Sequence, residues 1–403
     1  MAIAFPEPSD RPAFAGGVPL FPDGLKLCRP AVAATEQLGS VLLDIVASGA
    51  LTNGRYVAEL ERRAAEYLGV RHCIAVSSCT SGLMLLLRAS ELSGDVIVPS
   101  FTFAATAHAV AWAGLRPVFA DIDPQTLTLS PRSVMRATGV RAAAILATHT
   151  YGTPADVEGL DDIARRNGIR LFFDAAHAFG SLHGGRHVGT FGDAEVFSLS
   201  PTKVLVAAEG GIIATQNDVL AERCRIGRDY GNPGDYDCRF IGLNARMSEL
   251  HAAVALASLD DIEDRIRDRN ALADHYGSAL GTVPGITLPV VPPDDRSTYK
   301  DFTVLVDPEA FGTDARTLAS ALAAEGIETR RYYDPPVHRM RAYERLAAST
   351  NGSLATTDYA SRRVLCLPLW NGMSDEDVDR VCEAIQRIGL HMRRHTEGVR
   401  HGI

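Results

Sequence analysis

Two side chains of opposite charge stand where they could do chemistry together. Asp174 directly follows three apolar residues at 171–173 (Leu-Phe-Phe), and Lys203 ends the stretch 197–203 (Phe-Ser-Leu-Ser-Pro-Thr-Lys). A carboxylate at the mouth of a buried strand is costly unless a cation or hydrogen bonds compensate it. Taken singly, Asp174 could also be a metal ligand or a helix cap, and Lys203 a solvated loop lysine. The neighbouring segments of the sequence distinguish between these roles.

A third segment has the features of a phosphate site. Residues 78–83 (Ser-Cys-Thr-Ser-Gly-Leu) follow an apolar run and open a helix-like run at 83–87. Free N–H groups, hydroxyls and the positive end of the dipole at a helix N-terminus suit a phosphate, although a simple Ser/Thr helix cap has the same composition. The chain lacks G-x-x-x-x-G-K-[ST] and G-x-G-x-x-G, so neither a nucleoside triphosphate nor a dinucleotide is the expected ligand.

The order of these segments points to one cofactor. A phosphate cradle, a strand-end acid and a lysine among hydroxyl residues follow one another as a pyridoxal 5'-phosphate (PLP) site requires. We therefore interpret Lys203 as the lysine that carries the cofactor and Asp174 as the partner of its protonated ring nitrogen. A lysine in this role needs surroundings that disfavour its cationic form, because the neutral amine is the nucleophile.

The elements that must position these residues are strands and helices in alternation. Seven short apolar runs alternate with amphipathic segments between about residues 35 and 240. This pattern indicates an α/β fold whose mostly parallel sheet is covered by helices on both faces. Ligands of such sheets bind outside the carboxyl ends of the strands. The expected strands are 73–76, 96–98, 117–120, 144–147, 171–173, 196–199 and 212–214.

Four regions are expected along the chain. Residues 1–34 are rich in Pro and Gly and predict an N-terminal arm that wraps another surface, such as a second subunit. Residues 35–246 form the large domain, and 247–280 a connecting segment in which one long helix runs from about 247 to 276. Residues 281–403 form a smaller C-terminal domain with strands and helices of its own.

Composition narrows the class of partner. The formal charge of -9 and the lack of a dense Lys/Arg run argue against nucleic acid or an anionic membrane, and favour small-molecule substrates. No stretch is long and apolar enough for a membrane span, and the N-terminus does not resemble a signal peptide. A cytoplasmic location is therefore expected. The seven cysteines are scattered and form no C-x-x-C pair, so neither a disulfide frame nor a metal site is expected.

On these motifs, the chain resembles the DegT/DnrJ/EryC1/StrS family of PLP-dependent aminotransferases. The resemblance runs from about residue 52 to 369. Besides the three segments above, it includes 54–61 (Gly-Arg-Tyr-Val-Ala-Glu-Leu-Glu), 99–106 (Pro-Ser-Phe-Thr-Phe-Ala-Ala-Thr), 149–152 (His-Thr-Tyr-Gly) and 242–247 (Gly-Leu-Asn-Ala-Arg-Met). It implies aminotransferase fold type I, with a large PLP-binding domain and a smaller α+β domain.

The resemblance also implies roles for individual residues. It makes Lys203 the Schiff-base lysine, and it gives Asn244 a phosphate contact in the neighbouring subunit's site, so that a homodimer with two shared sites is expected. The chain departs from the usual family pattern at Cys79, His177 and Ala208, where Gly, Gln and Gly are common. The other implied cofactor contacts are Cys79, Thr80 and Ser198 to the phosphate, Phe103 stacked on the ring, Asp174 at the ring nitrogen and His177 near the ring hydroxyl.

The resemblance favours transamination. Family members that dehydrate sugars carry His in place of the lysine at 203. The expected reaction moves an amino group from L-glutamate to a keto-sugar, most of all a nucleotide-linked one. A cyclitol ketone, elimination or carbon–carbon bond formation on an amino acid, and a PLP-binding regulator without catalysis stay open as alternatives. Residues that could meet an acceptor's diphosphate or carboxylate, or could form a solvated basic face, are Lys300, Arg330, Arg331 and His338.

Overall fold

The centre of the molecule is a seven-stranded sheet. The computed structural model describes residues 11–32, 35–347 and 353–400. The strand order is β1-β9-β8-β5-β4-β2-β3. Neighbouring strands are parallel from β8 through to β3, while β9 runs antiparallel to both β1 and β8. All seven expected runs coincide with strands of this sheet, and the expected mostly parallel α/β architecture is confirmed.

The strands of the sheet and the helices around it have the following bounds. The strands are β1 (His72–Val76), β2 (Asp95–Pro99), β3 (Arg116–Ala120), β4 (Ala142–Thr148), β5 (Arg170–Asp174), β8 (Ala194–Ser198) and β9 (Gly211–Thr215). The helices are α1 (Glu36–Ser48), α2 (Arg55–Leu68), α3 (Cys79–Ala89), α4 (Ala104–Trp112), α5 (Pro131–Ala137), α6 (Val157–Asn167), α7 (Asp218–Gly227) and α8 (Glu249–Leu259).

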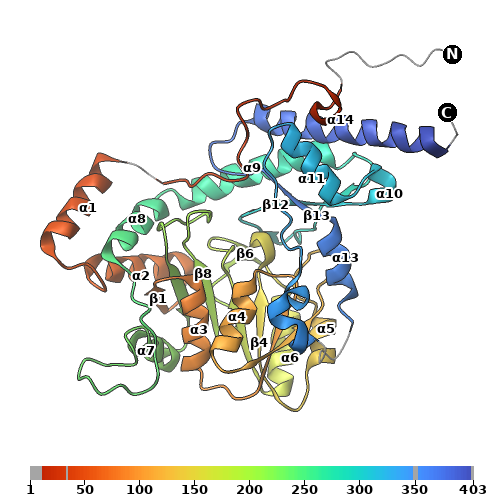
Figure 1. Ribbon diagram of the computed structural model, residues 1–403. Helices are drawn as coiled ribbons and strands as arrows, with labels where there is room; N and C mark the ends of the chain where they lie inside the picture. The colour runs from red at the N-terminus through yellow and green to blue at the C-terminus, as the bar shows by residue number, and fades with distance from the viewer. Residues whose placement is uncertain (1–10, 33–34, 348–352, 401–403) are drawn as a thin grey trace.

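Both faces of the sheet are buried, which explains the apolar runs. Successive side chains of a strand point to opposite faces. In β4, Ile145 and Ala147 join the core cluster that contains residues of α2, α5, α6 and α8. Ala144 and Leu146 join the cluster that contains residues of α3, α4 and α7. The sheet is therefore a middle layer between two helical layers (Figure 1).

The start of α3 is held close to the sheet edge by two glycines. A Cβ added to Gly82 would lie 2.9 Å from a methyl of Val196 on β8. A Cβ added to Gly211, at the start of β9, would lie 2.7 Å from the backbone nitrogen of Cys79. These close approaches need residues without side chains. They place the N-terminal part of α3 directly beside β8 and the start of β9.

The prediction of one long helix from 247 to 276 is wrong. The chain forms α8 and then α9 (Ile262–Leu280), and the helix is interrupted at Asp260 and Asp261. Asp261 has φ −106° and ψ 14°, outside the helical range. Asp side chains favour helix ends over helix interiors, and Asp260 is also held by an ion pair with Arg63 of α2 at 2.8 Å. The apolar periodicity continues across the break, so the pattern alone predicted a single helix.

The C-terminal part of the chain has a core of its own. It contains β10 (Ile286–Thr287), β12 (Phe302–Val306), α10 (Pro308–Phe311), α11 (Ala315–Ala324), α12 (Glu344–Ala347), α13 (Ala355–Arg363), β13 (Val364–Leu367) and α14 (Asp375–Arg400). The strands form an antiparallel sheet in the order β10-β12-β13. Figure 1 shows α9, α11 and α14 gathered around it, above the large sheet. The domain limits at 34, 246 and 280 stay predictions.

The N-terminal arm packs on this C-terminal part of its own chain. Phe21 and Leu25 are buried in the same core cluster as residues of α11 and α14. Leu25 pairs with Ile327, and the Glu325 carboxylate accepts hydrogen bonds from the backbone N–H groups of Ala13 and Leu20 at 2.7 and 3.0 Å. Residues 1–10 and 33–34 of the expected arm lie outside the described residues.

None of the helices in the described ranges combines the length and the apolar character that crossing a membrane requires.

A small third sheet ties two parts of the chain together. It has the order β11-β6-β7, with β6 (Leu182–His183), β7 (Arg186–His187) and β11 (Asp295–Arg296). His183 places Nδ1 2.7 Å from Asp295 and Nε2 2.7 Å from Glu158 of α6. Burial opposes protonation of His183, but the two carboxylates outweigh burial and raise its pKa.

Replacing His183 with Gln should remove a pH-dependent part of the stability. Because the folded-state pKa is raised, the contribution is complete below the unfolded pKa of about 6.5 and is lost as the pH rises through the folded value. We expect H183Q to lose on the order of 1 kcal/mol in urea unfolding at about pH 5.5, and less at about pH 9. E158Q should show part of the effect. A loss that is equal at both pH values would contradict this account.

Candidate functional site

A cavity of about 280 Å³ opens at the carboxyl edge of the large sheet. Its wall is formed by the start of α3, the ends of β5 and β8, the loop that follows β8, and two segments of the C-terminal part. The lining residues are Ser78, Cys79, Thr80, Phe103, Ala105, Asp174, Ala176, His177, Ser198, Ser200, Thr202, Lys203, Glu209, Gly210, Lys300, Asp301, Tyr332 and Tyr333. The structure thus brings the three sequence segments to one place.

Lys203 lies in this wall in surroundings that disfavour its charge. Its backbone N–H donates to the carbonyl of Ser200 at 3.0 Å, which forms the turn after β8. Burial and then the positive charge of Lys300 lower the pKa of Lys203 to about 8. A much larger share of the amine is therefore neutral at physiological pH than in an exposed lysine, whose pKa is about 10.4. A neutral amine is what a nucleophilic lysine requires.

Asp174 ends β5 and is almost fully buried, with 4% of its surface exposed. Its Oδ2 accepts a hydrogen bond from the Thr106 hydroxyl at 2.6 Å, and its Oδ1 one from the backbone N–H of Ala176 at 3.2 Å. Burial raises the pKa of Asp174, although these two hydrogen bonds act in the opposite direction. Among the residues that the structure describes, no cation forms an ion pair with Asp174. A cationic ligand group would supply the missing partner.

The start of α3 offers backbone donors to an anion. The Ser78 hydroxyl accepts from the N–H of Ser81 at 3.1 Å, and the Ser78 carbonyl accepts from the N–H of Gly82 at 3.0 Å. Cys79 and Thr80 are the first two residues of the helix, so their N–H groups have no intrahelical acceptor. The Ser198 and Ser200 hydroxyls line the same cavity, 3.3 Å apart. These donors suit a phosphate.

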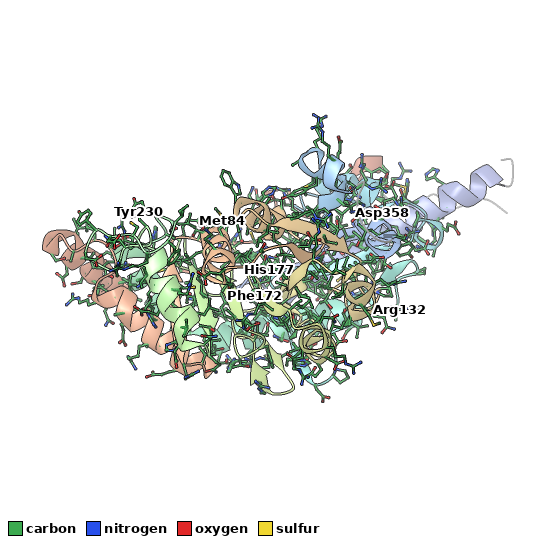
Figure 2. The ribbon with its side chains drawn as sticks, turned by 90° about the horizontal axis from the view of Figure 1, so that it is seen from below. Met84, Arg132, Phe172, His177, Tyr230 and Asp358 are labelled. Atoms are coloured by element: carbon green, nitrogen blue, oxygen red, sulfur yellow. The ribbon has the colours of Figure 1, made fainter. Side chains whose placement is uncertain are left out.

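His177 contributes an orphaned polar atom. Its Nδ1 is buried and has no hydrogen-bond partner among the described residues. Burial and the charges of Lys203 and Lys300 lower the pKa of His177 well below its ordinary value, so the ring is neutral. Figure 2 shows His177 near the middle of the molecule. With the lone Asp174 carboxylate, this atom makes the cavity fit a ligand that carries a phosphate, a cationic ring nitrogen and a further polar group.

Two of the residues that the family resemblance implies as cofactor contacts, Phe103 and Asn244, are exposed. Phe103 lines the cavity as the residue before α4, with 61% of its surface exposed. Asn244 is exposed, and its backbone pairs with Asp229. It lies outside the set of residues that line the cavity of its own chain, so the shared site stays a prediction.

Of the four residues considered for the acceptor, Lys300 lies in the cavity wall. Arg330 pairs with Glu328 at 2.8 Å, and Arg331 with Asp334 at 2.6 Å. His338 is buried between Ser100 at 2.6 Å and Asp358 at 3.2 Å, and Figure 2 shows Asp358 well apart from His177. These three side chains are held by ion pairs and hydrogen bonds outside the cavity lining, and their role toward a substrate stays a prediction.

Sequence reasoning did not single out several residues at this site. Thr106 lies in the first turn of α4, at the end of the 99–106 motif, and its hydroxyl could have been noticed there. Ser200 and Glu209 lie close to Lys203 in the sequence, but no spacing signal marks them as site residues. Asp301, Tyr332 and Tyr333 reach the cavity from loops far along the chain. Asp301 and the two tyrosines are brought in by the C-terminal part, whose placement depends on tertiary packing.

Comparisons with known proteins identify the family. The model of the DegT/DnrJ/EryC1/StrS aminotransferase family matches residues 33–386. The spore coat polysaccharide biosynthesis protein SpsC of Bacillus subtilis (strain 168) is 31% identical over 359 residues, which are 86% of this chain and 92% of SpsC.

Solved structures agree in fold as well. DesI, crystallised in the presence of its TDP-sugar product, has a TM-score of 0.90 and 36% identity over 98% of this chain and 100% of its own. DesV of S. venezuelae, in complex with a ketimine intermediate, has a TM-score of 0.82 and 33% identity over 88% and 94%. The chain therefore belongs to the DegT/DnrJ/EryC1/StrS aminotransferase family and is a PLP-dependent transaminase of fold type I.

Proposed function

We propose that this protein transfers an amino group from L-glutamate to a nucleotide-linked keto-sugar, with PLP bound at Lys203. The observation that carries the proposal is one cavity that joins a lysine of lowered pKa, a buried carboxylate without a cation and the free N–H groups of α3. The acceptor class is supported by relatives, because DesI was crystallised with its TDP-sugar product and SpsC is a polysaccharide biosynthesis protein.

The geometry of the cavity supports a role for each residue that would hold the cofactor. The N–H groups of Cys79 and Thr80 and the hydroxyls of Ser198 and Ser200 would bind the phosphate. Asp174 would pair with the ring nitrogen. His177 would offer its orphaned Nδ1 to the ring's polar substituent. When bound, PLP supplies an electron-poor ring that accepts the electron pair released at the substrate Cα.

Lys203 and Asp174 divide the proton chemistry. The neutral Nζ of Lys203 would be the nucleophile that holds the cofactor, and as a free amine it would accept the proton from the Cα of the donor. A base positioned in this way contributes roughly 10²–10⁴ in rate. Asp174 would keep the ring nitrogen of the cofactor protonated, since its buried carboxylate would be stabilised by a cation. Thr106 keeps that carboxylate oriented through the 2.6 Å hydrogen bond.

Incubation of the PLP-loaded protein with L-glutamate should change the visible absorbance and release 2-oxoglutarate. Lys203→Ala should abolish the release, while Lys26→Ala, which changes a lysine with 72% of its side chain exposed, should leave it unchanged. The form of the enzyme that remains after this release should then aminate TDP-linked keto-sugars. A cyclitol ketone serves as the competing acceptor. If no common amino donor changes the spectrum, a carbanion reaction of another type or a regulatory role becomes the better account.

Asp174→Asn should keep the shape of the cavity and remove the negative charge. The loss of one electrostatic partner of this kind costs about 10²–10³ in kcat, and we expect a loss of that size in single-turnover reaction with L-glutamate. The matched control is Asp162→Asn, an exposed carboxylate that pairs with Arg166 on α6. Full activity of D174N would remove Asp174 from the mechanism.

We also propose a homodimer in which Asn244 of each subunit completes the partner's site, since Asn244 is exposed and lies outside its own cavity lining. Mixed dimers of K203A and N244A subunits then contain one native site. Random assortment of the two subunits gives about a quarter of wild-type activity in a symmetric dimer with shared sites. The measurement is the aminotransferase activity of the two variants after they have been refolded together or coexpressed. Activity equal to the mean of the two parent variants would count against shared sites.

A further inference from the structure

The lysines of this chain are rare and unevenly placed. Of the 40 Lys and Arg residues, only three are lysines: Lys26, Lys203 and Lys300. Lys26 is exposed, and the other two line the same cavity. In a chain that otherwise uses arginine for positive charge, a second lysine beside the nucleophilic one calls for a chemical reason. An ammonium is a compact point charge, whereas a guanidinium is a wide planar fork.

Lys300 is fixed by its backbone and by its side chain. Its N–H donates to the carbonyl of Tyr151 at 2.9 Å, and its carbonyl accepts from Arg269 of α9 at 2.9 Å. Its Nζ donates to Asp301 at 2.7 Å and lies 5.5 Å from the centre of the Tyr332 ring. Only 7% of the Lys300 side chain is exposed. The ammonium is therefore held at one point in the cavity wall.

Lys300 also keeps its charge. Burial opposes the charged form, but Asp301 outweighs burial and raises the pKa of Lys300. Oδ1 of Asp301 accepts from Lys300, while Oδ2 is buried and has no partner among the described residues. The pair thus presents a permanent cation to the cavity, with its counter-charge on the adjacent residue.

Several groups act on the charge of Lys203. Asp301, Cys79 and Asp174 favour the cation, while burial and Lys300 oppose it. His177 is neutral, as shown above. The remaining titratable residues of the cavity lining are Glu209, Tyr332 and Tyr333. Among the described lining residues, Lys300 is thus the cation that shares the cavity with Lys203.

We propose that the Lys300 ammonium, anchored by Asp301, is a positioning group that keeps Nζ of Lys203 neutral and reactive. The proposal rests on the proposed role of Lys203 as nucleophile and base. Two like charges that line one cavity repel each other, so a fixed cation disfavours the protonated form of the neighbouring amine. Lys300 itself need not touch a substrate in this role.

Competitive labelling of the full-length, cofactor-free protein tests the proposal. Any bound cofactor is first removed with hydroxylamine, and the protein is treated with trace acetic anhydride across a pH series. Mass spectrometry of the peptides then gives the reactivity of Lys203 relative to Lys26, which serves as an internal reference in the same chain. The midpoint of the curve is compared between variants, because burial slows the reagent in all of them.

The variants separate charge from shape. Lys300→Met leaves Asp301 uncompensated, so the Lys203 midpoint should move to higher pH, and below the midpoint its reactivity should fall about tenfold per pKa unit. Lys300→Arg keeps the charge and should retain the wild-type midpoint, near the value of about 8 given above. The double change K300M/D301N removes both charges without leaving a buried unpaired acid, and should show a smaller shift in the same direction. It keeps the test available if K300M does not fold.

Two outcomes would overturn the proposal. If the midpoints of K300M and K300M/D301N coincide with that of the wild type, Lys300 does not set the protonation of Lys203. If K300M only raises KM for L-glutamate while the labelling curve stays in place, Lys300 binds the donor carboxylate instead. The labelling needs neither substrate nor turnover, so its result is independent of whether glutamate is the donor.

Discussion

A carboxylate and an amine are held out of water at the same edge of one sheet, and most of the structure serves that arrangement. Burial raises the pKa of Asp174 and lowers that of Lys203, which means that each group is placed against its own solvation preference. Such a placement persists only in a scaffold that is stable for other reasons. Here the scaffold is a sheet whose strands are covered on both faces by apolar side chains.

Other buried acids of this protein show what a purely structural carboxylate looks like. Glu195 accepts from the N–H groups of Gly189 and Phe191 and from His149, and all three partners are buried with it. Glu249 accepts from three backbone N–H groups at the start of α2. These acids are fully satisfied by the protein. Asp174 accepts two hydrogen bonds and has no ion-pair partner among the described residues, and one oxygen of Asp301 has no partner among them. Both acids line the cavity, together with Glu209.

The C-terminal part of the chain contributes to the site by holding two loop segments in the cavity wall. Arg269 on α9 donates to carbonyls of Tyr299, Lys300 and Leu369, so one buried guanidinium holds the segment that carries the Lys300–Asp301 pair. Beside it, Asp295 on β11 joins the His183 cluster. The cavity wall therefore depends on contacts between segments that are distant in the sequence.

The sequence by itself determined the sheet and the candidate pair of Asp174 and Lys203. The seven apolar runs predict strands because they are short and alternate with amphipathic helical segments. Strands that are buried on both faces of a parallel sheet have this near-continuous apolar character. Asp174 and Lys203 could be identified because each follows a strand whose carboxyl end reaches the same sheet edge. The break between α8 and α9 could not be predicted, since it interrupts a helix without interrupting the apolar periodicity.

Only the tertiary structure decided which charged residues join the site. Lys300, Arg330, Arg331 and His338 are alike in sequence, as basic residues in the C-terminal part. Packing turns Lys300 into the cavity and gives the other three to ion pairs and hydrogen bonds elsewhere. Asp301, Tyr332 and Tyr333 carry no periodic signal at all. Their positions follow from how Arg269 and the loop carbonyls orient the chain, and such contacts between distant segments leave no local pattern in the sequence.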